Sequence, residues 1–373
     1  MGTETQRSGE GAGYEAADWC GPSASFRSAP SLAGAASKPV PPRRVALVRD
    51  PYHTRARAAG LDVERDRARA VVGAARTAVT ATFDDIRFGR RIDMAALQPV
   101  VAGIAASISR HPAALPSVTR LKQVHEYTYL HSVAVCGLMI GLARELDLPD
   151  ELTHDIGLAG LLHDIGKATV PVALLDKPGP LDLDEYALVQ RHTIRRRELL
   201  EDSGVTSEIA LDVCLHHHER ADGAGYPLGI ALPAISLHAR MGAVCDVYDA
   251  VTSRRSYKNS WSPGEALEWM TGTTGQFDPR VLQAFRRMIG LFPVGSLVRL
   301  ESQRLALVVD DGEAAGSPPV VCVVMCAATR CSLVPVRTST AHDRILGLEL
   351  STRWPLDNWK GQRAAILAEH AVP

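Results

Sequence analysis

Long apolar runs and a strong net charge are both missing from this sequence. No apolar stretch approaches the roughly 18 residues that a membrane-spanning helix needs. The N-terminus also lacks the basic start and apolar core of a signal peptide. The 373 residues carry a formal net charge of -1, which argues against a nucleic acid polymer or an acidic membrane surface as partner. We therefore expect a cytoplasmic protein, large enough for two or three domains.

The sequence also lacks a recognisable disulfide framework or cysteine-based zinc site. Its seven cysteines are scattered, and several lie in apolar surroundings, where a reduced thiol behaves as a small hydrophobic side chain. Cys322, Cys326 and Cys331 stand closer together, but their spacing matches no usual zinc pattern. This use of cysteine is typical of a reducing compartment.

Changes in composition along the chain predict a mainly α protein with four regions. Residues 1–42 are rich in Gly, Ser, Ala and Pro and predict a disordered extension. Residues 43–115 predict an N-terminal helical region, either a regulatory or dimerising element or a plain packing extension. Residues 116–290 are almost wholly helical in pattern, and residues 291–373 predict a small β module and tail. The buried stripe expected in the N-terminal region is Ala95, Leu97, Val100, Val101 and Ile104.

The stretch from Leu161 to Lys167 places a histidine and an aspartate inside an apolar helix. A buried imidazole and a buried carboxylate each need a partner or a cation. If the helix continues through Gly166, then His163, Asp164 and Lys167 project from one face. A carboxylate there could bridge two metal ions, with an ammonium beyond it to meet a phosphate.

The same letters, His-Asp-Ile-Gly, occur nine residues earlier, beginning at His154. Nine helical steps of about 100° place that copy on the opposite helix face. Only one copy can point into a given pocket. We favour the second, because Leu161 and Leu162 precede it and Lys167 follows it.

Seven residues of the helical region could ligate metal, several of them in apolar helices. Imidazole and carboxylate together suit iron, manganese or zinc, and seven ligands are too many for one ion. Two ions about 3.5 to 4 Å apart, bridged by Asp164, would use the whole set. The seven are His131, His163, Asp164, His192, His217, His218 and Asp246.

The order of these motifs strongly resembles the HD-GYP branch of the HD phosphohydrolases. The blocks are His131, His163-Asp164-Ile165-Gly166-Lys167, His192, His217-His218-Glu219, Asp222-Gly223-Ala224-Gly225-Tyr226-Pro227 and Asp246-Val247-Tyr248-Asp249-Ala250. The resemblance covers about 170 residues, with all these blocks in order. The resemblance implies an all-helical HD-type catalytic domain over residues 116–290.

The resemblance also implies how the ligands divide between two metals, iron or manganese. One metal would be held by His131, His163, Asp164 and Asp246, and the other by Asp164, His192, His217 and His218. A third metal in some members needs a glutamate one turn before His131, where this chain has Tyr127. We therefore expect two metals.

The activity implied is hydrolysis of cyclic di-GMP, a bacterial second messenger, to linear pGpG, with GMP as the alternative end product. Asp164 and Lys167 would be catalytic, with Lys167 stabilising the transition state or the leaving oxygen. Arg255 and Lys258 match phosphate-contacting positions of the family, although a solvated loop is the alternative. Asp222 and Tyr226 lie in the loop that names the family, and either contact substrate or a partner, or form a rigid turn.

Two other functions stay open at this point. The domain could be a catalytically weak sensor or partner-binding module, or an HD hydrolase of another cyclic dinucleotide. The resemblance suggests a diguanylate cyclase domain as partner, and the helical N-terminal region suggests a homodimer. Product analysis and a substrate panel would separate these alternatives.

Overall fold

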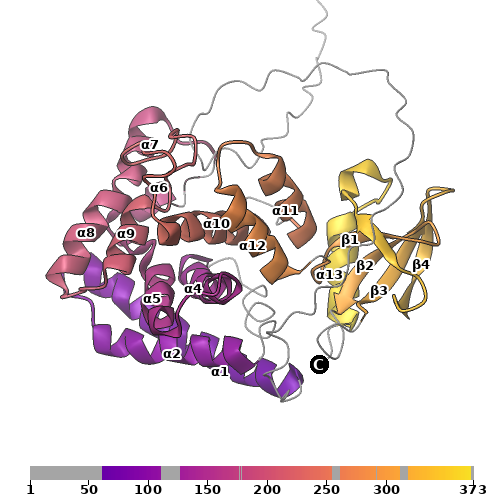
Figure 1. Ribbon diagram of the computed structural model, residues 1–373, viewed down its shortest axis with the longest axis horizontal. Helices are drawn as coiled ribbons and strands as arrows, with labels where there is room; N and C mark the ends of the chain where they lie inside the picture. The colour runs from indigo at the N-terminus through magenta and orange to yellow at the C-terminus, as the bar shows by residue number, and fades with distance from the viewer. Residues whose placement is uncertain are drawn as a thin grey trace, which may run out of the picture. The chain divides into compact units, whose positions relative to one another are not determined.

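The computed structural model describes the helical part of the chain and the β module, with short gaps. Described are residues 61–110, 127–175, 177, 179–253, 261–290, 292–310 and 318–370. The predicted disordered extension, residues 1–42, lies outside these ranges. The domain boundaries near residues 115 and 290 stay predictions. The predicted fold class is confirmed, because helices dominate and a small antiparallel sheet follows them (Figure 1).

The helical part begins with two long helices, α1 (Leu61–Arg87) and α2 (Met94–Arg110). None of the described helices combines the length and apolar character that crossing a bilayer requires. The helices and 3-10 segments that follow are α4 (Tyr127–Glu145), η4 (Asp150–Leu152), α5 (Thr153–Leu162), η5 (Ile165–Thr169), α6 (Val172–Leu175), α7 (Leu183–Gln190), α8 (His192–Asp202), α9 (Glu208–His216), α10 (Leu237–Thr252), α11 (Pro263–Gly272) and α12 (Pro279–Ile289).

One hydrophobic core runs through this helical part, from Val72 on α1 to Phe285 on α12. Helix α4 is buried nearly all round, as its unbroken apolar sequence requires. On α2 the predicted stripe is buried except for Ala95, which is exposed. Ala95 precedes Leu97 by two residues, or about 200° of helical rotation, and so faces away from the core.

The sequence pattern over Asp182–Leu200 predicts one helix, but the structure has two, so that prediction is wrong. The break falls at Arg191, between α7 and α8. His192 Nδ1 lies 2.6 Å from the Val189 carbonyl oxygen, and Thr193 Oγ1 donates to the Gln190 carbonyl across 2.9 Å. These side chains compete with backbone N–H groups for the same carbonyls, which explains the break.

The sequence also predicts helix starts at the capping box Ser262-Pro263-Gly264-Glu265 and at Asp278-Pro279, and the cap geometry confirms both. Ser262 and Glu265 form the expected capping box at α11, since each side chain accepts the other residue's backbone N–H. Asp278 accepts the Arg280 N–H at the start of α12, with Pro279 at the first position. Both caps satisfy N–H groups that have no partner inside the helix.

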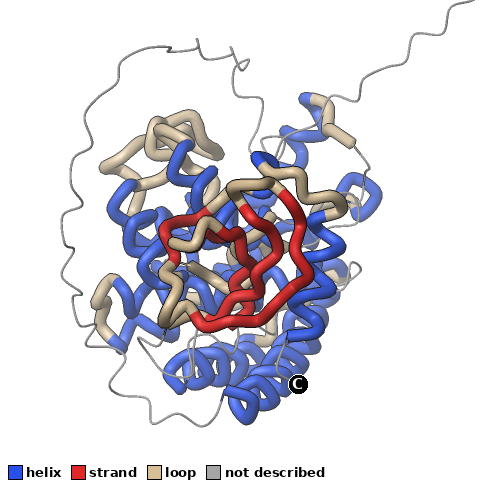
Figure 2. Tube along the Cα trace, turned by 90° about the vertical axis from the view of Figure 1, so that its right-hand side faces the viewer, coloured by secondary structure: helices blue, strands red, loops and turns tan. Residues whose placement is uncertain are grey.

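The β module is a five-stranded antiparallel sheet with one helix packed on it (Figure 2). The strand order is β4-β3-β2-β1-β5, and Leu297 pairs with Leu307 between β1 and β2. Trp359 and Ile366 of α13 pack on the face that carries Leu305. The strands and the helix are β1 (Leu297–Leu300), β2 (Arg304–Asp310), β3 (Val320–Cys326), β4 (Cys331–Ser339), β5 (Ile345–Leu348) and α13 (Trp359–His370).

Candidate metal centre

Asp164 occupies the junction between α5 and η5. Helix α5 ends at Leu162, and the 3-10 segment begins at Ile165. The condition for a shared face, one α-helix continuing through Gly166, is therefore not met. Asp164 adopts φ −108° and ψ 8°, which interrupts the α-helical geometry. Lys167 nevertheless remains close, because its Nζ donates to Asp164 Oδ2 across 2.6 Å.

The two His-Asp pairs differ sharply in burial. The side chains of His163 and Asp164 are each 1% exposed. Those of His154 and Asp155 are 44% and 43% exposed. The expectation that the earlier copy points away from the interior is confirmed.

Two groups of potential ligand atoms meet at Asp164. Within each group, one ligand atom from every member lies within 4.8 Å of the others. The structure thus brings together all seven residues singled out in the sequence, and their binding of metal stays a prediction. The groups are His131, His163, Asp164 and Asp246, and Asp164, His192, His217 and His218.

The two carboxylate oxygens of Asp164 face different groups. Its Oδ2 lies 3.6 Å from His131 Nε2 and 3.5 Å from His163 Nε2. Its Oδ1 lies 3.5 Å from His192 Nε2 and 3.8 Å from His217 Nε2. A carboxylate placed between two ligand groups in this way is able to bridge two cations.

Backbone carbonyls set the orientation of three of the histidine rings. The Nδ1 atom of His163 lies 2.8 Å from the Gly160 oxygen, and that of His217 lies 3.0 Å from the Val213 oxygen. His192 makes the equivalent contact within its own turn. A carbonyl only accepts hydrogen bonds, so Nδ1 carries the proton and Nε2 keeps its lone pair for the centre.

Close packing of α4 against α5 places two of these histidines beside each other. A Cβ atom on Gly160 would lie 2.8 Å from the Cys136 Cα, so only glycine allows this approach. The rings of His131 and His163 then meet edge to face, with centroids 4.9 Å apart. The apolar run of α4 therefore fixes half of the centre through its packing.

The carboxylates of the centre are ionised. Burial would raise the pKa of Asp164, but the Lys167 ammonium and the His163 ring hold it well below its usual range. Burial would also raise the pKa of Asp246, and the neighbouring rings of His131 and His163 outweigh it and lower the pKa. Buried carboxylates with imidazole nitrogens form a donor set that fits divalent iron, manganese or zinc.

The segment after His218 is a tight loop organised by the buried carboxylate of Glu219. That carboxylate accepts three backbone N–H groups from residues 228–230, at 2.7, 3.2 and 3.1 Å. A Cβ atom on Gly225 would lie 2.5 Å from the Glu219 Cα, so the loop closes only with glycine there. These contacts therefore fix the conformation of the loop beside the site.

Tyr226 contacts the centre directly. Its ring stacks on that of His218, with centroids 4.7 Å apart and an interplanar angle of 26°. Asp222 instead pairs with Arg220 and accepts the Ala224 N–H. The hydrogen bond from Arg220 is the main reason why the pKa of Asp222 is lowered. The predicted substrate contacts Arg255 and Lys258 lie outside the described residues.

Asp249 is a site residue whose role the sequence reasoning missed. Its Oδ2 lies 2.7 Å from His131 Nδ1, so it orients that ring from α10. The signal was present, because Asp249 follows Asp246 by three residues and shares its helix face. Glu219 was quoted only as part of a motif, and its three backbone contacts depend on a loop path that spacing does not reveal.

Comparison with known proteins identifies the family to which this chain belongs. Residues 104–281 match the model of the HD domain family. A cyclic di-GMP phosphodiesterase of Pseudomonas aeruginosa is 49% identical over 295 residues, which cover 77% of this chain and 71% of that protein. The chain belongs to the HD domain family. The order of its motifs and these relatives place it in the HD-GYP branch.

Other relatives match shorter parts of the chain. A cyclic di-GMP phosphodiesterase response regulator of Xanthomonas campestris is 41% identical, over 41% of this chain and 40% of its own. A 3'3'-cGAMP-specific phosphodiesterase of Vibrio cholerae is 37% identical, over 43% and 38%. A solved HD-GYP-type protein of Bdellovibrio bacteriovorus shares the fold, with a TM-score of 0.50 at 20% identity, over 61% of this chain and 72% of that one.

Proposed function

We propose that this protein is a two-metal phosphodiesterase that opens cyclic di-GMP to pGpG and cleaves pGpG further to GMP. The observation that carries the proposal is the position of Asp164, whose two oxygens face two separate ligand groups. The relatives that match the chain are phosphodiesterases by name, which supports the same reaction.

The ligand residues would hold iron or manganese, one ion in each group. Bound divalent ions supply Lewis acidity, which activates water and neutralises charge on the phosphoryl oxygens. The protein contributes the fixed orientation of its imidazoles, through contacts between Nδ1 and backbone carbonyls. Buried carboxylates keep the negative charge that a cation needs.

Lys167 is the proposed cationic partner of the reacting phosphate. Its Nζ lies 2.6 Å from Asp164 Oδ2, and its side chain is 11% exposed. An ammonium held at this place can stabilise negative charge on the phosphoryl or leaving oxygen. Tyr226, Arg255 and Lys258 are the proposed substrate contacts. Asp222 would stabilise the loop that carries Tyr226.

Product analysis tests the reaction. Protein purified without oxygen and loaded with iron or manganese should convert cyclic di-GMP to pGpG and GMP. Asp164→Ala should lower the rate by more than about 100-fold, beyond the effects of residues that only orient ligands. Asp155→Ala is the matched control, because it changes the exposed His-Asp pair. Equal rates for the Asp164 variant and the wild type would refute the proposal.

Metal analysis tests the cofactor separately. Two ions per chain are expected in the wild type. Chelation should abolish product formation and lower the melting temperature, because metal binding stabilises the folded state by mass action. Readdition of iron or manganese should restore both. A melting temperature and rate that do not respond to chelation would contradict a metal-dependent site.

A second candidate substrate is favoured by one finding, the similarity to 3'3'-cGAMP-specific phosphodiesterases. A panel of cyclic di-GMP, 3'3'-cGAMP and cyclic di-AMP at equal concentration should rank cyclic di-GMP first by kcat/KM. Tight binding without turnover in metal-loaded protein would point to a sensor. A cytoplasmic location, a homodimer and a diguanylate cyclase partner remain proposals made from the sequence.

A further inference from the structure

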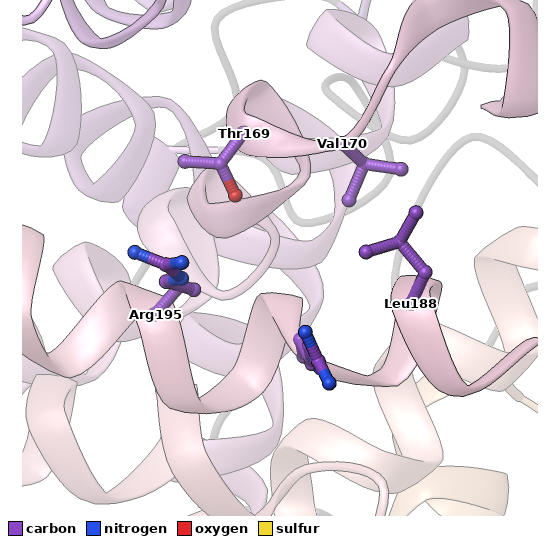
Figure 3. A pocket seen from close by; sticks show the side chains of 5 residues that line it. Thr169, Val170, Leu188 and Arg195 are labelled. Atoms are coloured by element: carbon purple, nitrogen blue, oxygen red, sulfur yellow. The ribbon is translucent and has the colours of Figure 1, made fainter. Parts of the chain in front are cut away.

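A pocket of about 270 Å³ lies between η5 and the junction of α7 with α8. Figure 3 shows Val170 and Leu188 on one side of it and Thr169 and Arg195 on the other. The pocket therefore combines an apolar wall with a polar, basic wall. Its lining residues are Thr169, Val170, Leu188, Arg191 and Arg195.

The two arginines concentrate positive charge in this pocket. They are one helical turn apart, since Arg195 N–H donates to the Arg191 carbonyl across 3.0 Å. Both are exposed, and among the side chains that the structure describes, which do not include those of residues 196–198, neither guanidinium pairs with a carboxylate. Like charges at this spacing disfavour each other, and a bound anion would offset that repulsion. Guanidinium groups suit a phosphate in particular, because their N–H donors match its oxygens.

The pocket is too small for a whole dinucleotide. Its volume falls below the roughly 300–1,000 Å³ typical of sites for drug-sized ligands. A single phosphate group with its sugar is a ligand of matching size, for which Val170 and Leu188 offer the apolar wall. The Thr169 hydroxyl donates its proton to the Gly166 carbonyl, so its oxygen is left as an acceptor for a sugar hydroxyl and not as a donor to the phosphate.

The proposed reaction creates a group that this pocket can distinguish. Water oxygen bonds to phosphorus, the bond from phosphorus to the 3′ oxygen breaks, and a proton goes to that oxygen. The cyclic substrate contains only phosphodiesters, each with one negative charge. The product carries a 5′-phosphate monoester, whose charge at pH 7 is between about −1.5 and −2. Two adjacent arginines favour the more highly charged group.

We propose that this pocket is a product subsite that binds the 5′-phosphate monoester of pGpG or GMP; the inference rests on the proposed function. It is built from the same two segments as the metal centre. Thr169 follows Lys167 by two residues, and Val170 N–H donates to the Lys167 carbonyl across 3.1 Å. Arg191 directly precedes His192. Product bound here remains beside the centre and slows the next turnover.

Calorimetric titration of the full-length protein tests the subsite without relying on turnover. The probes are GMP, inorganic phosphate and guanosine. The test variant is Arg191→Gln with Arg195→Gln, and the matched control is Arg280→Gln with Arg286→Gln, which removes two exposed charges from α12. Arg191→Lys with Arg195→Lys retains charge and guards against loss of folding, which circular dichroism checks.

The wild type and the α12 control should bind GMP more tightly than phosphate, and guanosine should not bind. The glutamine variant should lose about tenfold in GMP affinity. The GMP affinity of the lysine variant should lie between those of the glutamine variant and the wild type. Inhibition of hydrolysis by GMP should weaken in parallel. Phosphate binding as tight as GMP would identify free phosphate as the ligand and overturn the product assignment. Equal GMP affinity of the glutamine variant and wild type would overturn the site.

The two proposals can fail separately. If the wild type binds GMP through the arginines but does not hydrolyse cyclic di-GMP, the proposed reaction falls and the monoester site stands without its product role. If hydrolysis occurs and the arginines do not affect GMP affinity or inhibition, the subsite falls and the reaction stands.

Discussion

His131 on α4 and Asp249 on α10 are joined by a hydrogen bond of 2.7 Å between Nδ1 and Oδ2. The same ring presents its Nε2 to Asp246 Oδ1 at 2.9 Å. Asp249 thus fixes the proton on Nδ1 and directs the other nitrogen into the centre. Two carboxylates one helical turn apart therefore act differently, Asp246 within the ligand group and Asp249 through the ring of His131.

Asp249→Asn should lower metal affinity and activity together. An amide can take up the contact with either of its ends, so the ring is no longer held in one tautomer. The expected loss in metal affinity is roughly 10- to 100-fold. Metal content after dialysis against a graded chelator measures it. Asp155→Asn, at an exposed aspartate, serves as control, and a variant with wild-type metal retention would contradict the positioning role.

We expect the Tyr226 ring to hold the His218 ring in position by stacking on it. Tyr226→Phe keeps the stacked ring and should retain metal content, whereas Tyr226→Ala should lower it. Kinetics then separate the roles, because a hydroxyl that contacts substrate would raise KM in the Phe variant with little change in kcat. Phe88→Ala, at an exposed aromatic of the α1 end, is the control. Full metal retention in the Ala variant would show that stacking has no positioning role.

Glu219→Gln should loosen the loop after His218. One Glu219 oxygen accepts two backbone N–H groups and the other accepts a third. In the glutamine variant an NH2 group replaces one of these oxygens, so at least one backbone N–H then faces another donor. This should cost about 1–3 kcal/mol of stability. Urea unfolding measures the loss, and limited proteolysis reports opening of the loop. Glu268→Gln changes an exposed glutamate and should leave both unchanged; equal behaviour of the two variants would refute the role.

Glu64 should make stability depend on pH. Its fully buried carboxylate accepts two hydrogen bonds from Arg110 and one from Ser107, and the Arg110 hydrogen bonds are the main cause of its lowered pKa. A lowered pKa means that this stabilisation is complete above the ordinary value of 4.5 and is lost as pH falls through the folded-state pKa.

The Glu64→Gln variant provides the measurement. Urea unfolding at pH 7 should show a loss of about 1–2 kcal/mol relative to wild type, reduced because Arg110 is partly exposed. The difference should shrink as pH is lowered below 4.5. Glu301→Gln is the control, because Glu301 pairs with Arg344 on the surface. A difference that grows towards low pH would contradict the sign of the effect.

Much of the site could be predicted from sequence because its chemistry is carried by residue identity at fixed helical spacing. Buried histidines and aspartates stand out in apolar helices, since they are costly there without a partner. Proline and serine caps likewise marked the starts of α11 and α12 correctly. Helical spacing and cap residues were sufficient wherever the interacting groups are close in sequence.

The errors came from interactions that local spacing does not contain. The break at Arg191 depends on side chains that take backbone carbonyls. Asp249 gained its role from a residue 118 positions away. In the β module, β4, β5 and α13 were not predicted individually, because their burial depends on sheet order.

The shared carboxylate makes the site unequal in its tolerance of mutation. Loss of His192 or Asp246 leaves one ligand group complete. Loss of Asp164 removes a member from both groups at once, and it also deprives Lys167 of its ion-pair partner. Substitutions at residues that belong to one group would therefore leave the other group intact during evolution. A substitution of Asp164 would disrupt both groups, so we expect this position to tolerate no change.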